Sequence, residues 1–383
     1  MYSIIGGGIG GLTTALAFEK LGIEYQLFEK AEQLIPVGSG ILLPPNSLQV
    51  FEWLGILDDV SLCGSVMKQI TLTKPDMTPL FDYAQEDVKE MFGFYAISIH
   101  RWELQNVLLK KIPTHKIHLG KSLDTFKQIK EKVHLTFLDG TKIETDFLLG
   151  ADGIQSNIRK QLFPKSKTRY SGQTCWRGIC NYEDLAEEYN YRGIEMWGEQ
   201  ARFGITKIEE NTFYWFAVVL SPQNQKDVPN TITDILLKTF ANFHPVVGKL
   251  IGATHEEKII RSDLNDVKPM PYWYKGNICL LGDAAHATTP NMGQGGAQAI
   301  EDAYYLAKAI CQESKSHAFS VFQQNRSKKV NLIVRQSLLM GIIGHWKYFV
   351  WLRNFILTYT PSSIFKIRWR SIYTLKNYES TIN

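Results

Sequence analysis

The chain has 383 residues, of which 44% are hydrophobic and 21% charged, and its formal net charge is +4. This composition is that of an ordinary soluble globular protein, and the length suits two domains or one large domain with an insertion. No run of about 18 apolar residues is present, which argues against a membrane-spanning helix.

The five cysteines form no CxxC pair, which argues against a zinc or other metal site and against a disulfide framework. This pattern predicts a reducing, cytoplasmic location. Met1 leads directly into an apolar strand, so we expect no signal peptide. No nucleic-acid partner is expected, and the sequence leaves monomer and dimer open.

Residues 2–30 predict a strand, a glycine-rich turn, a helix and a second strand. Gly6, Gly8 and Gly11 satisfy G-x-G-x-x-G, in which the glycines allow a tight turn, a close pyrophosphate and close helix packing. Glu29 ends the second strand, where an acid would bind ribose hydroxyls. The unit predicts a dinucleotide site but does not separate FAD from NAD.

The next segments predict a helix capped by Asn46, strands across residues 66–97 and a helix over 100–109. Arg101 lies near the start of that helix, where a plain surface arginine is an alternative reading. Residues 116–149 predict a hairpin that turns at Asp139–Gly140.

A second Asp-Gly turn, Asp152–Gly153, follows an apolar strand and precedes a short helix with Arg159, which is not the context of a hairpin. Residues 166–275 then change character. Alternating aromatic and β-branched residues predict a separate antiparallel sheet, in which most of the aromatic cluster at 213–216 would be core. Residues 231–252 predict one helix.

Residues 278–302 repeat the layout of strand, glycine loop and helix. An apolar run ends at Gly282–Asp283, a loop with several glycines follows, and a helix is predicted over 297–309. This layout directs backbone N–H groups and a helix N-terminus at an anion. Together with residues 2–30 and the Asp152 turn, it predicts one flavin site.

The predicted fold class is therefore α/β: a Rossmann-like FAD-binding domain, an inserted, mainly antiparallel β-sheet substrate domain, and C-terminal helices. The predicted division is 1–66, 98–165 and 276–325 for the FAD-binding domain, 67–97 and 166–275 for the substrate domain, and 326–383 for the C-terminal helical region.

Three motifs occur in order: GGGIGG at 6–11, GADGIQSNIR at 150–159 and LLGDAAHATTPNMGQGG at 280–296. With these motifs the chain resembles the group A flavoprotein monooxygenases, the fold family of para-hydroxybenzoate hydroxylase. Within that family it is similar to the zeaxanthin epoxidase, salicylate hydroxylase and FAD-dependent urate hydroxylase types.

The resemblance implies which residues bind the cofactor. They are Gly6, Gly8, Gly10 and Gly11 at the pyrophosphate; Glu29 at the adenosine ribose, with Lys30 next to it; Leu123 near the adenine; Arg101 at the diphosphate or ribityl chain; Asp152 where FAD and NAD(P)H meet; Asp283 at the ribityl hydroxyls; and Pro290, Gly293, Gln294, Gly295, Gly296 and Ala297 at the flavin ring.

The implied activity is an NAD(P)H-dependent monooxygenation. NAD(P)H would reduce FAD, O2 would form a flavin hydroperoxide, and its distal oxygen would hydroxylate or epoxidise a small aromatic or an apolar polycyclic or isoprenoid substrate. The family has no second Rossmann motif for NAD(P)H, and this chain has none. Arg202 and Tyr214 would face the substrate as catalytic residues; a rim arginine and a packed core tyrosine are the alternative readings.

One residue departs from the urate hydroxylase type, in which an aspartate precedes the glycine loop. This chain has Asn291 there, and a neutral amide cannot act as a general base, so urate is disfavoured as the substrate. Two other functions stay open: a flavin-dependent dehydrogenase or reductase of the geranylgeranyl reductase kind, and a non-enzymatic binding protein on the same scaffold, as in the Rab GDP-dissociation inhibitors. The intact loop at 293–296 argues against the latter.

The C-terminal region is unusually basic. Residues 314–378 contain eleven Lys and Arg and no Asp or Glu, so the remainder of the chain carries a net charge of −7. Residues 338–370 mix these cations with bulky apolar residues. They predict a helical pair that packs on the FAD-binding domain, or alternatively a surface that makes weak contact with a membrane.

Overall fold

The computed structural model describes residues 1–35, 39–83, 85–185, 189–314, 317–376 and 378. At its centre is a six-stranded sheet, in which β1 (Tyr2–Ile5) lies between β2 (Tyr25–Phe28) and β12 (Phe147–Gly150) and runs parallel to both. Both β1 and β12 are fully buried, as expected for a covered parallel sheet. The strand order is β18-β19-β12-β1-β2-β8, with β8 at Ile117–His118, β18 at Tyr274–Lys275 and β19 at Ile278–Leu280.

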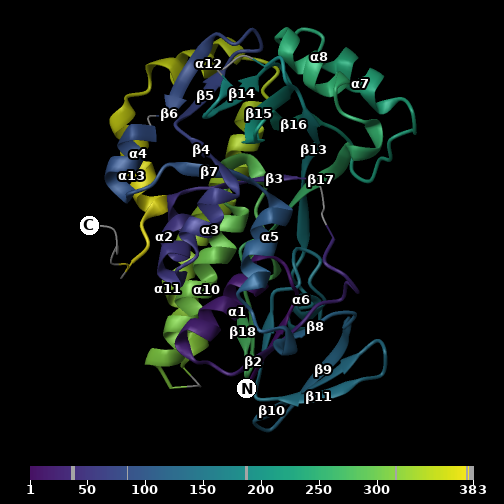
Figure 1. Cartoon of the computed structure of the whole chain (residues 1–383), viewed down its shortest axis with the longest axis vertical. Helices are drawn as coiled ribbons and strands as arrows, with labels where there is room; N and C mark the ends of the chain where they lie inside the picture. The colour runs from purple at the N-terminus through teal and green to yellow at the C-terminus, as the bar shows by residue number, and fades with distance from the viewer. Residues whose placement is uncertain (36–38, 84, 186–188, 315–316, 377, 379–383) are drawn as a thin grey trace.

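Helices from both halves of the chain pack together beside this sheet. Helix α1 (Ile9–Leu21) contacts α10 (Gly295–Gln312), which in turn contacts α2 (Pro45–Leu54) and α11 (Ala318–Gly344). Figure 1 shows them bundled in the lower and middle part of the molecule. The shorter helices here are α3 (Leu57–Leu62), α5 (Arg101–Lys110), α6 (Asn157–Leu162) and α9 (Asp283–His286).

Two small antiparallel sheets extend this body. One has the order β11-β10-β9, and its predicted turn at Asp139–Gly140 joins β10 (Lys132–Phe137) to β11 (Lys142–Thr145), with β9 at Leu123–Ile129. The other has the order β3-β7-β4, from β3 (Gly40–Leu43), β4 (Gly64–Met67) and β7 (Ala96–His100). Strand β3 positions part of the candidate site described below.

A seven-stranded, mainly antiparallel sheet forms the upper part of the molecule, as the sequence predicted (Figure 1). One face packs on two helices around a core that includes Phe203 and Trp215, and the other face turns toward β3 and the glycine loops. The strand order is β17 (Ile260–Val267), β13 (Thr168–Asn181), β16 (Thr212–Leu220), β15 (Ala201–Glu209), β14 (Arg192–Trp197), β5 (Gln69–Thr73) and β6 (Pro79–Tyr83).

Three local predictions were wrong. The single helix expected over 231–252 is two helices, α7 (Ile232–Thr239) and α8 (Pro245–Gly252), because a proline starts a helix more readily than it continues one. Residues 85–92, within the expected strands at 66–97, form helix α4 (Gln85–Phe92). Asn46 does not cap α2, since the cap position is Pro44 and Asn46 lies inside the first turn.

The C-terminal region is helical, as predicted. After α11 come α12 (Val350–Tyr359), which contacts β6, and α13 (Ser362–Tyr373), which contacts α2, α4 and α11. Among the described helices, none is both long enough and apolar enough to cross a bilayer.

Candidate functional site

The first glycine loop, between β1 and α1, is pressed against the end of β12. Gly6 has φ +114, and a Cβ there would lie 2.4 Å from the carbonyl oxygen of Ala151, while a Cβ at Gly11 would lie 1.9 Å from that of Gly6. At Gly8 a Cβ would meet nothing within 4 Å, so open space adjoins the start of α1. No side chain caps this helix N-terminus. The loop therefore offers backbone amides to an anion.

Gly10 has a packing role in this structure. A Cβ there would lie 3.1 Å from the Cβ of Ala299 on α10, so the missing side chain lets α1 and α10 approach. Glu29 braces the same loop: its two carboxylate oxygens accept hydrogen bonds from Gly7 N at 2.6 Å and Ala31 N at 2.9 Å. Lys30 is exposed beside it, and Leu123 is buried at the start of β9.

The Asp-Gly turn after β12 is joined to the loop that follows β19. One Asp152 oxygen accepts from Asn157 N at 2.8 Å, and the other is buried without a partner. The buried Arg159 side chain donates to Ile154 O within the turn and to Ala284 O at 2.9 Å. Arg159 thus holds the second and third motifs together.

Asp283 begins α9 directly after Gly282, whose φ is +55. Its side chain is reachable by solvent, yet the protein packed around it raises its pKa, and the nearby His286, Arg101 and Arg159 oppose that rise. Arg101, the first residue of α5, is also exposed. Asp283 and Arg101, which are far apart in the sequence, therefore interact electrostatically. Such a pair is expected where a protein binds the polar chain of a cofactor.

The second glycine loop rests on β3. It passes from the exposed Pro290 through Gly293, at φ +62, to the buried Gln294, which precedes α10. A Cβ at Gly296 would lie 2.8 Å from Ile41 on β3. No side chain caps α10, whose first turn, Gly295 to Ala297, also lacks acidic residues. Its N-terminal amides are thus free of side-chain competition for an anionic group.

Arg202, on β15, is buried and tied to this loop. Its guanidinium donates to Glu195 Oε1 at 3.0 Å and to Asn291 Oδ1. Burial lowers the pKa of Arg202, and the Glu195 carboxylate acts in the opposite direction. The Asn291 amide in turn donates to Thr289 Oγ1 at 3.0 Å and to Ser337 O at 2.9 Å. The arginine is therefore positioned from both sides.

Tyr214, on β16, lies on the same face of the sheet as Arg202, because Arg202 pairs with Val218 and side chains alternate faces along a strand. Its ring packs on Gly40 of β3, where a Cβ would lie 2.6 Å away. Burial raises the pKa of Tyr214 well above its usual value, so its hydroxyl stays protonated, with Arg177 acting in the opposite direction. Of the two predicted catalytic residues, Tyr214 thus faces β3 and Arg202 faces the second glycine loop.

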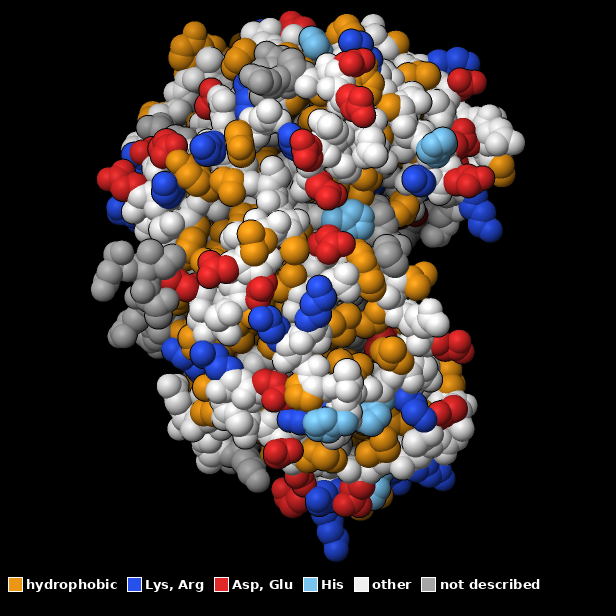
Figure 2. Space-filling model, in the orientation of Figure 1, with side chains coloured by type: hydrophobic (Ala, Val, Ile, Leu, Met, Phe, Trp, Pro, Cys, Tyr) orange, Lys and Arg blue, Asp and Glu red, His pale blue; other side chains and the backbone are white. Residues whose placement is uncertain are grey.

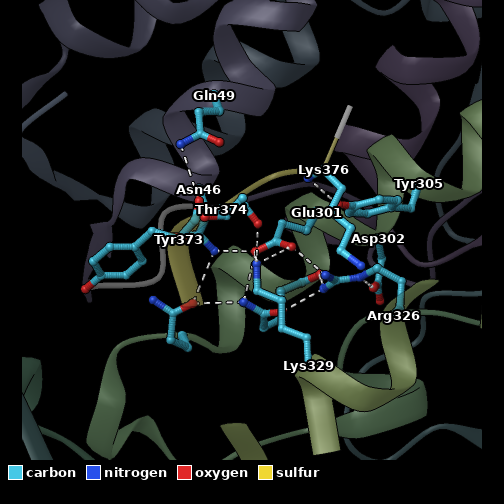
Figure 3. A network of polar contacts seen from close by, with 12 residues as sticks. Asn46, Gln49, Glu301, Asp302, Tyr305, Arg326, Lys329, Tyr373, Thr374 and Lys376 are labelled. Atoms are coloured by element: carbon cyan, nitrogen blue, oxygen red, sulfur yellow. Dashed lines mark hydrogen bonds and ion pairs between the residues drawn. The ribbon is translucent and has the colours of Figure 1, made fainter. Parts of the chain in front are cut away.

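A buried polar network that the sequence analysis missed supports both ends of the third motif, at Gly282 and at Gln294 (Figure 3). Arg326 of α11 donates to Glu301 and, at 2.7 Å, to Asp302 of α10. Asp302 also accepts from Gly282 N at 2.8 Å, next to Asp283. Asn46 donates to Glu301 at 2.5 Å and to Gln294 Oε1 at 3.2 Å. The adjacent acids Glu301 and Asp302, between the apolar residues Ile300 and Ala303 of α10, were the available signal.

The last turns of α11 close the site from the C-terminal side. A Cβ at Gly341 would lie 2.4 Å from the Asn291 amide, and one at Gly344 would lie 2.8 Å from Arg202 Cδ. His345 contacts the Gln173 amide at 3.1 Å, and burial, together with the charge of Arg202, lowers its pKa to about 4. His345 is therefore neutral at physiological pH.

A cavity of about 580 Å³ lies elsewhere, between β4, the start of α5 and the β15–β16 hairpin. Its lining includes His100, Glu103, Glu209 and Glu210 and none of the glycine-loop residues. Three acidic side chains against one lysine, Lys207, disfavour a phosphate-bearing ligand in this cavity.

Comparisons with known proteins identify relatives of the whole chain. Residues 2–336 match the family described as "FAD binding domain". Aurachin C monooxygenase/isomerase of Stigmatella aurantiaca is 36% identical to this chain, and the alignment covers 92% of each protein. The 2-heptyl-3-hydroxy-4(1H)-quinolone synthase of Pseudomonas aeruginosa is 31% identical, with 94% of each chain covered. Klebsiella pneumoniae HpxO, solved with FAD and uric acid, has a TM-score of 0.89 at 26% identity, covering 97% of this chain and 96% of that one.

Proposed function

The chain belongs to the FAD-binding-domain family and is an FAD-dependent monooxygenase, and from that premise we propose that it uses NAD(P)H and O2 to hydroxylate a small bicyclic aromatic ring, specifically a 2-alkyl-4-quinolone. One oxygen atom enters the product and the other leaves as water, with two electrons from NAD(P)H. The Pseudomonas relative is named for a 3-hydroxylated 4-quinolone with an alkyl chain, which supports this ring class.

Two features support FAD at the glycine loops. The first is the open space at Gly8, which a Cβ would fill and which lies beside an uncapped helix N-terminus. The second is the buried Asp152 oxygen without a partner, which can accept a hydrogen bond from a ligand. We propose that Gly6 to Gly11 hold the pyrophosphate and Glu29 the ribose, that Arg101 and Asp283 hold the ribityl diphosphate chain, and that the amides of 293–297 hold the ring. Bound FAD supplies electron transfer from NAD(P)H and activation of O2.

The observation that carries the substrate proposal is the pairing of Arg202 with Asn291 beside the second glycine loop. In a 4-quinolone the ring nitrogen already pushes electron density toward C3, so the ring carbon can attack an electrophilic oxygen without a strong base, and the site needs mainly a donor that orients the ring through its 4-oxygen. Arg202 would donate to the 4-oxygen and orient the ring, Asn291 would hold Arg202 in place, and the protonated Tyr214 would donate to the substrate or cover it.

The test of this function is product formation. The purified holoenzyme is given NADH or NADPH with 2-alkyl-4-quinolones, and O2 uptake and product mass are followed. We expect coupled uptake and a product heavier by one oxygen atom. Reduction of the substrate without O2 uptake would instead identify a reductase, and no cofactor oxidation with any ring compound would contradict the proposal.

Replacing Asp283 with alanine is expected to weaken FAD binding, because the ribityl hydroxyls lose a charged acceptor worth about 1–3 kcal/mol. This corresponds to about a tenfold to hundredfold rise in the FAD dissociation constant, measured by fluorescence titration. Asp58→Ala is the matched control, since Asp58 is also an exposed aspartate in the first turn of a short helix. Equal affinities in both variants would remove Asp283 from the site.

Replacing Arg202 with alanine is expected to slow substrate-dependent turnover by about 10²-fold, the effect of losing a contact that orients the substrate. FAD should stay bound, because Arg202 contacts the protein beside the loop and not the loop amides. Steady-state oxidation of NAD(P)H with and without substrate, together with flavin absorbance, measures the two effects. Unchanged turnover would assign the substrate contact elsewhere.

We also propose the domain division predicted from the sequence, with breaks near residues 66, 98, 166, 276 and 326, and a cytoplasmic enzyme that is a monomer or a dimer. Figure 2 shows acidic and basic side chains intermixed over the visible face. That mixture supports a small-molecule substrate over a nucleic acid, which favours a contiguous basic surface.

A further inference from the structure

The end of α11, the following turn and α12 expose an unusual number of large apolar side chains, although each helix is packed on the protein. We call this surface the α11–α12 apolar face. Its members are Leu339, Ile342, Tyr348, Phe349, Trp351, Phe355, Ile356 and Tyr359, all at least half exposed. Monomeric proteins rarely leave so many large apolar groups together on one short segment, so the face calls for a partner.

The face is held rigidly. Trp351, Phe355 and Tyr359 are spaced four residues apart, so they form one stripe along α12. On the inner side of the helix the buried Arg353 donates to Gly198 O at 3.2 Å and to Gly344 O at 3.1 Å. The exposed stripe therefore belongs to an anchored helix and not to a frayed end.

Phe349 adds a second observation. Its backbone has φ +60, a left-handed conformation that is unfavourable for a bulky residue, and its ring is 63% exposed. The strain is retained although the ring gains no burial from it. Such strain persists where the surrounding structure fixes it and marks functional positions.

The charges on this face fit an anionic surface. Arg335 and Lys347 are exposed on the same segment, and no Asp or Glu occurs anywhere in residues 314–378. The acidic groups on elements packed against this segment include Glu199, next to Gly198, whose carbonyl accepts from Arg353, and Asp87 of α4, which pairs with Lys366 at 2.9 Å. Trp and Tyr beside Lys and Arg are the residues that settle at a membrane–water interface.

The opposite side of the same helix turns lines the candidate substrate site. Gly341 and Gly344 lie against Asn291 and Arg202, whereas Leu339 and Ile342 point outward. An α-helix with its side chains is only about 10–12 Å thick. Only one helix therefore separates the exposed face, and any partner that covers it, from the candidate substrate site.

We propose that the α11–α12 apolar face rests on the surface of an anionic lipid bilayer, from which a substrate with an alkyl chain reaches the site. The inference rests on the proposed function for the identity of the substrate, but not for the contact itself. The contact is peripheral, since the apolar groups lie along helices that are too short or too polar to span a membrane.

The test is co-sedimentation of the full-length holoenzyme with vesicles of phosphatidylcholine alone or with phosphatidylglycerol, at low and high salt. We expect binding to the anionic vesicles that weakens with salt, and a loss of about tenfold in bound protein in the variant W351S/F355S. Leu138→Ser is the matched control, because Leu138 is 71% exposed in the turn at the far end of the molecule.

Failure of all variants to bind either kind of vesicle would overturn the contact, even if oxygenation of the quinolone is found. Concentration-dependent self-association that W351S/F355S abolishes, without vesicle binding, would assign the face to a second copy and also overturn it. Turnover of a short-chain substrate in detergent-free buffer should be equal in both variants. If the wild type binds vesicles but oxidises no ring compound, the contact stands and the proposed function fails.

Discussion

Replacing Arg326 with methionine is expected to destabilise the protein by about 3–5 kcal/mol, the cost of removing one partner from a buried ion pair. Arg326, Glu301 and Asp302 have no exposed side-chain surface. In the variant Glu301 keeps Lys329 at 2.8 Å, but Asp302 keeps only the His286 ring, at 2.6 Å, as a side-chain partner. Urea unfolding of the holoenzyme measures the change in the free energy of unfolding.

The same substitution is expected to release FAD, although Arg326 lies outside the cofactor loops. Asp302 holds Gly282 N, and Glu301 holds Asn46, which contacts Gln294. Loss of the arginine therefore loosens both ends of the third motif. Arg335→Met is the control, because Arg335 is exposed on the same helix. Equal stability and FAD content in the two variants would show that the network does not position the loops.

The pH dependence of this variant has a definite sign. Burial by itself raises the pKa of Asp302, but His286 and Arg326 outweigh it, so the folded-state pKa lies below the ordinary value. This carboxylate therefore contributes stability above its ordinary pKa and loses it as the pH falls. Without Arg326 the folded-state pKa rises, so the acid loss of stability should begin at a higher pH than in the wild type.

The glycine loops could be predicted from the sequence because their chemistry is local. A side chain at Gly11 would collide with the carbonyl oxygen of Gly6, and one at Gly6 would collide with a carbonyl oxygen that follows the adjacent strand. A strand followed by glycines at this spacing is therefore compatible with few other local structures. The parallel strands around them could also be predicted, because they are short apolar runs. The fold class followed from those elements.

The supporting network was not predictable, because its members are distant in sequence. Asn46 and Glu301, which bond at 2.5 Å, are 255 residues apart. Asn46 was read as a helix cap from its local sequence, yet Pro45 already occupies the first helical turn and frees the asparagine for the interior. A residue type that serves two structural roles cannot be assigned without its tertiary partners.

Arg202 and Tyr214 were named through a resemblance, and residue patterns alone gave core or rim roles. The structure places both on one face of the sheet, but it also pairs Arg202 with Glu195 and Asn291. Strand alternation could have predicted the shared face, whereas the pairing depends on the loop at 290–292 crossing that face. Their contact with substrate stays a prediction.

Replacing Gly11 with alanine is expected to abolish FAD binding and to destabilise the protein, whereas Gly8→Ala should abolish binding alone. At Gly11 the new Cβ would lie 1.9 Å from Gly6 O, so α1 must move away from the loop, at a cost of about 1–3 kcal/mol or more.

At Gly8 the new Cβ would meet no protein atom, and the extended backbone there, with φ −76, suits alanine, so the unfolding free energy should not fall. The same methyl would instead enter the space proposed for the pyrophosphate, where each 1.4 kcal/mol of lost contact raises the dissociation constant about tenfold. Thermal unfolding of the FAD-free proteins and FAD titration separate the two effects. Tight FAD binding by Gly8→Ala would exclude the pyrophosphate from this loop, because no folding defect would then obscure the result.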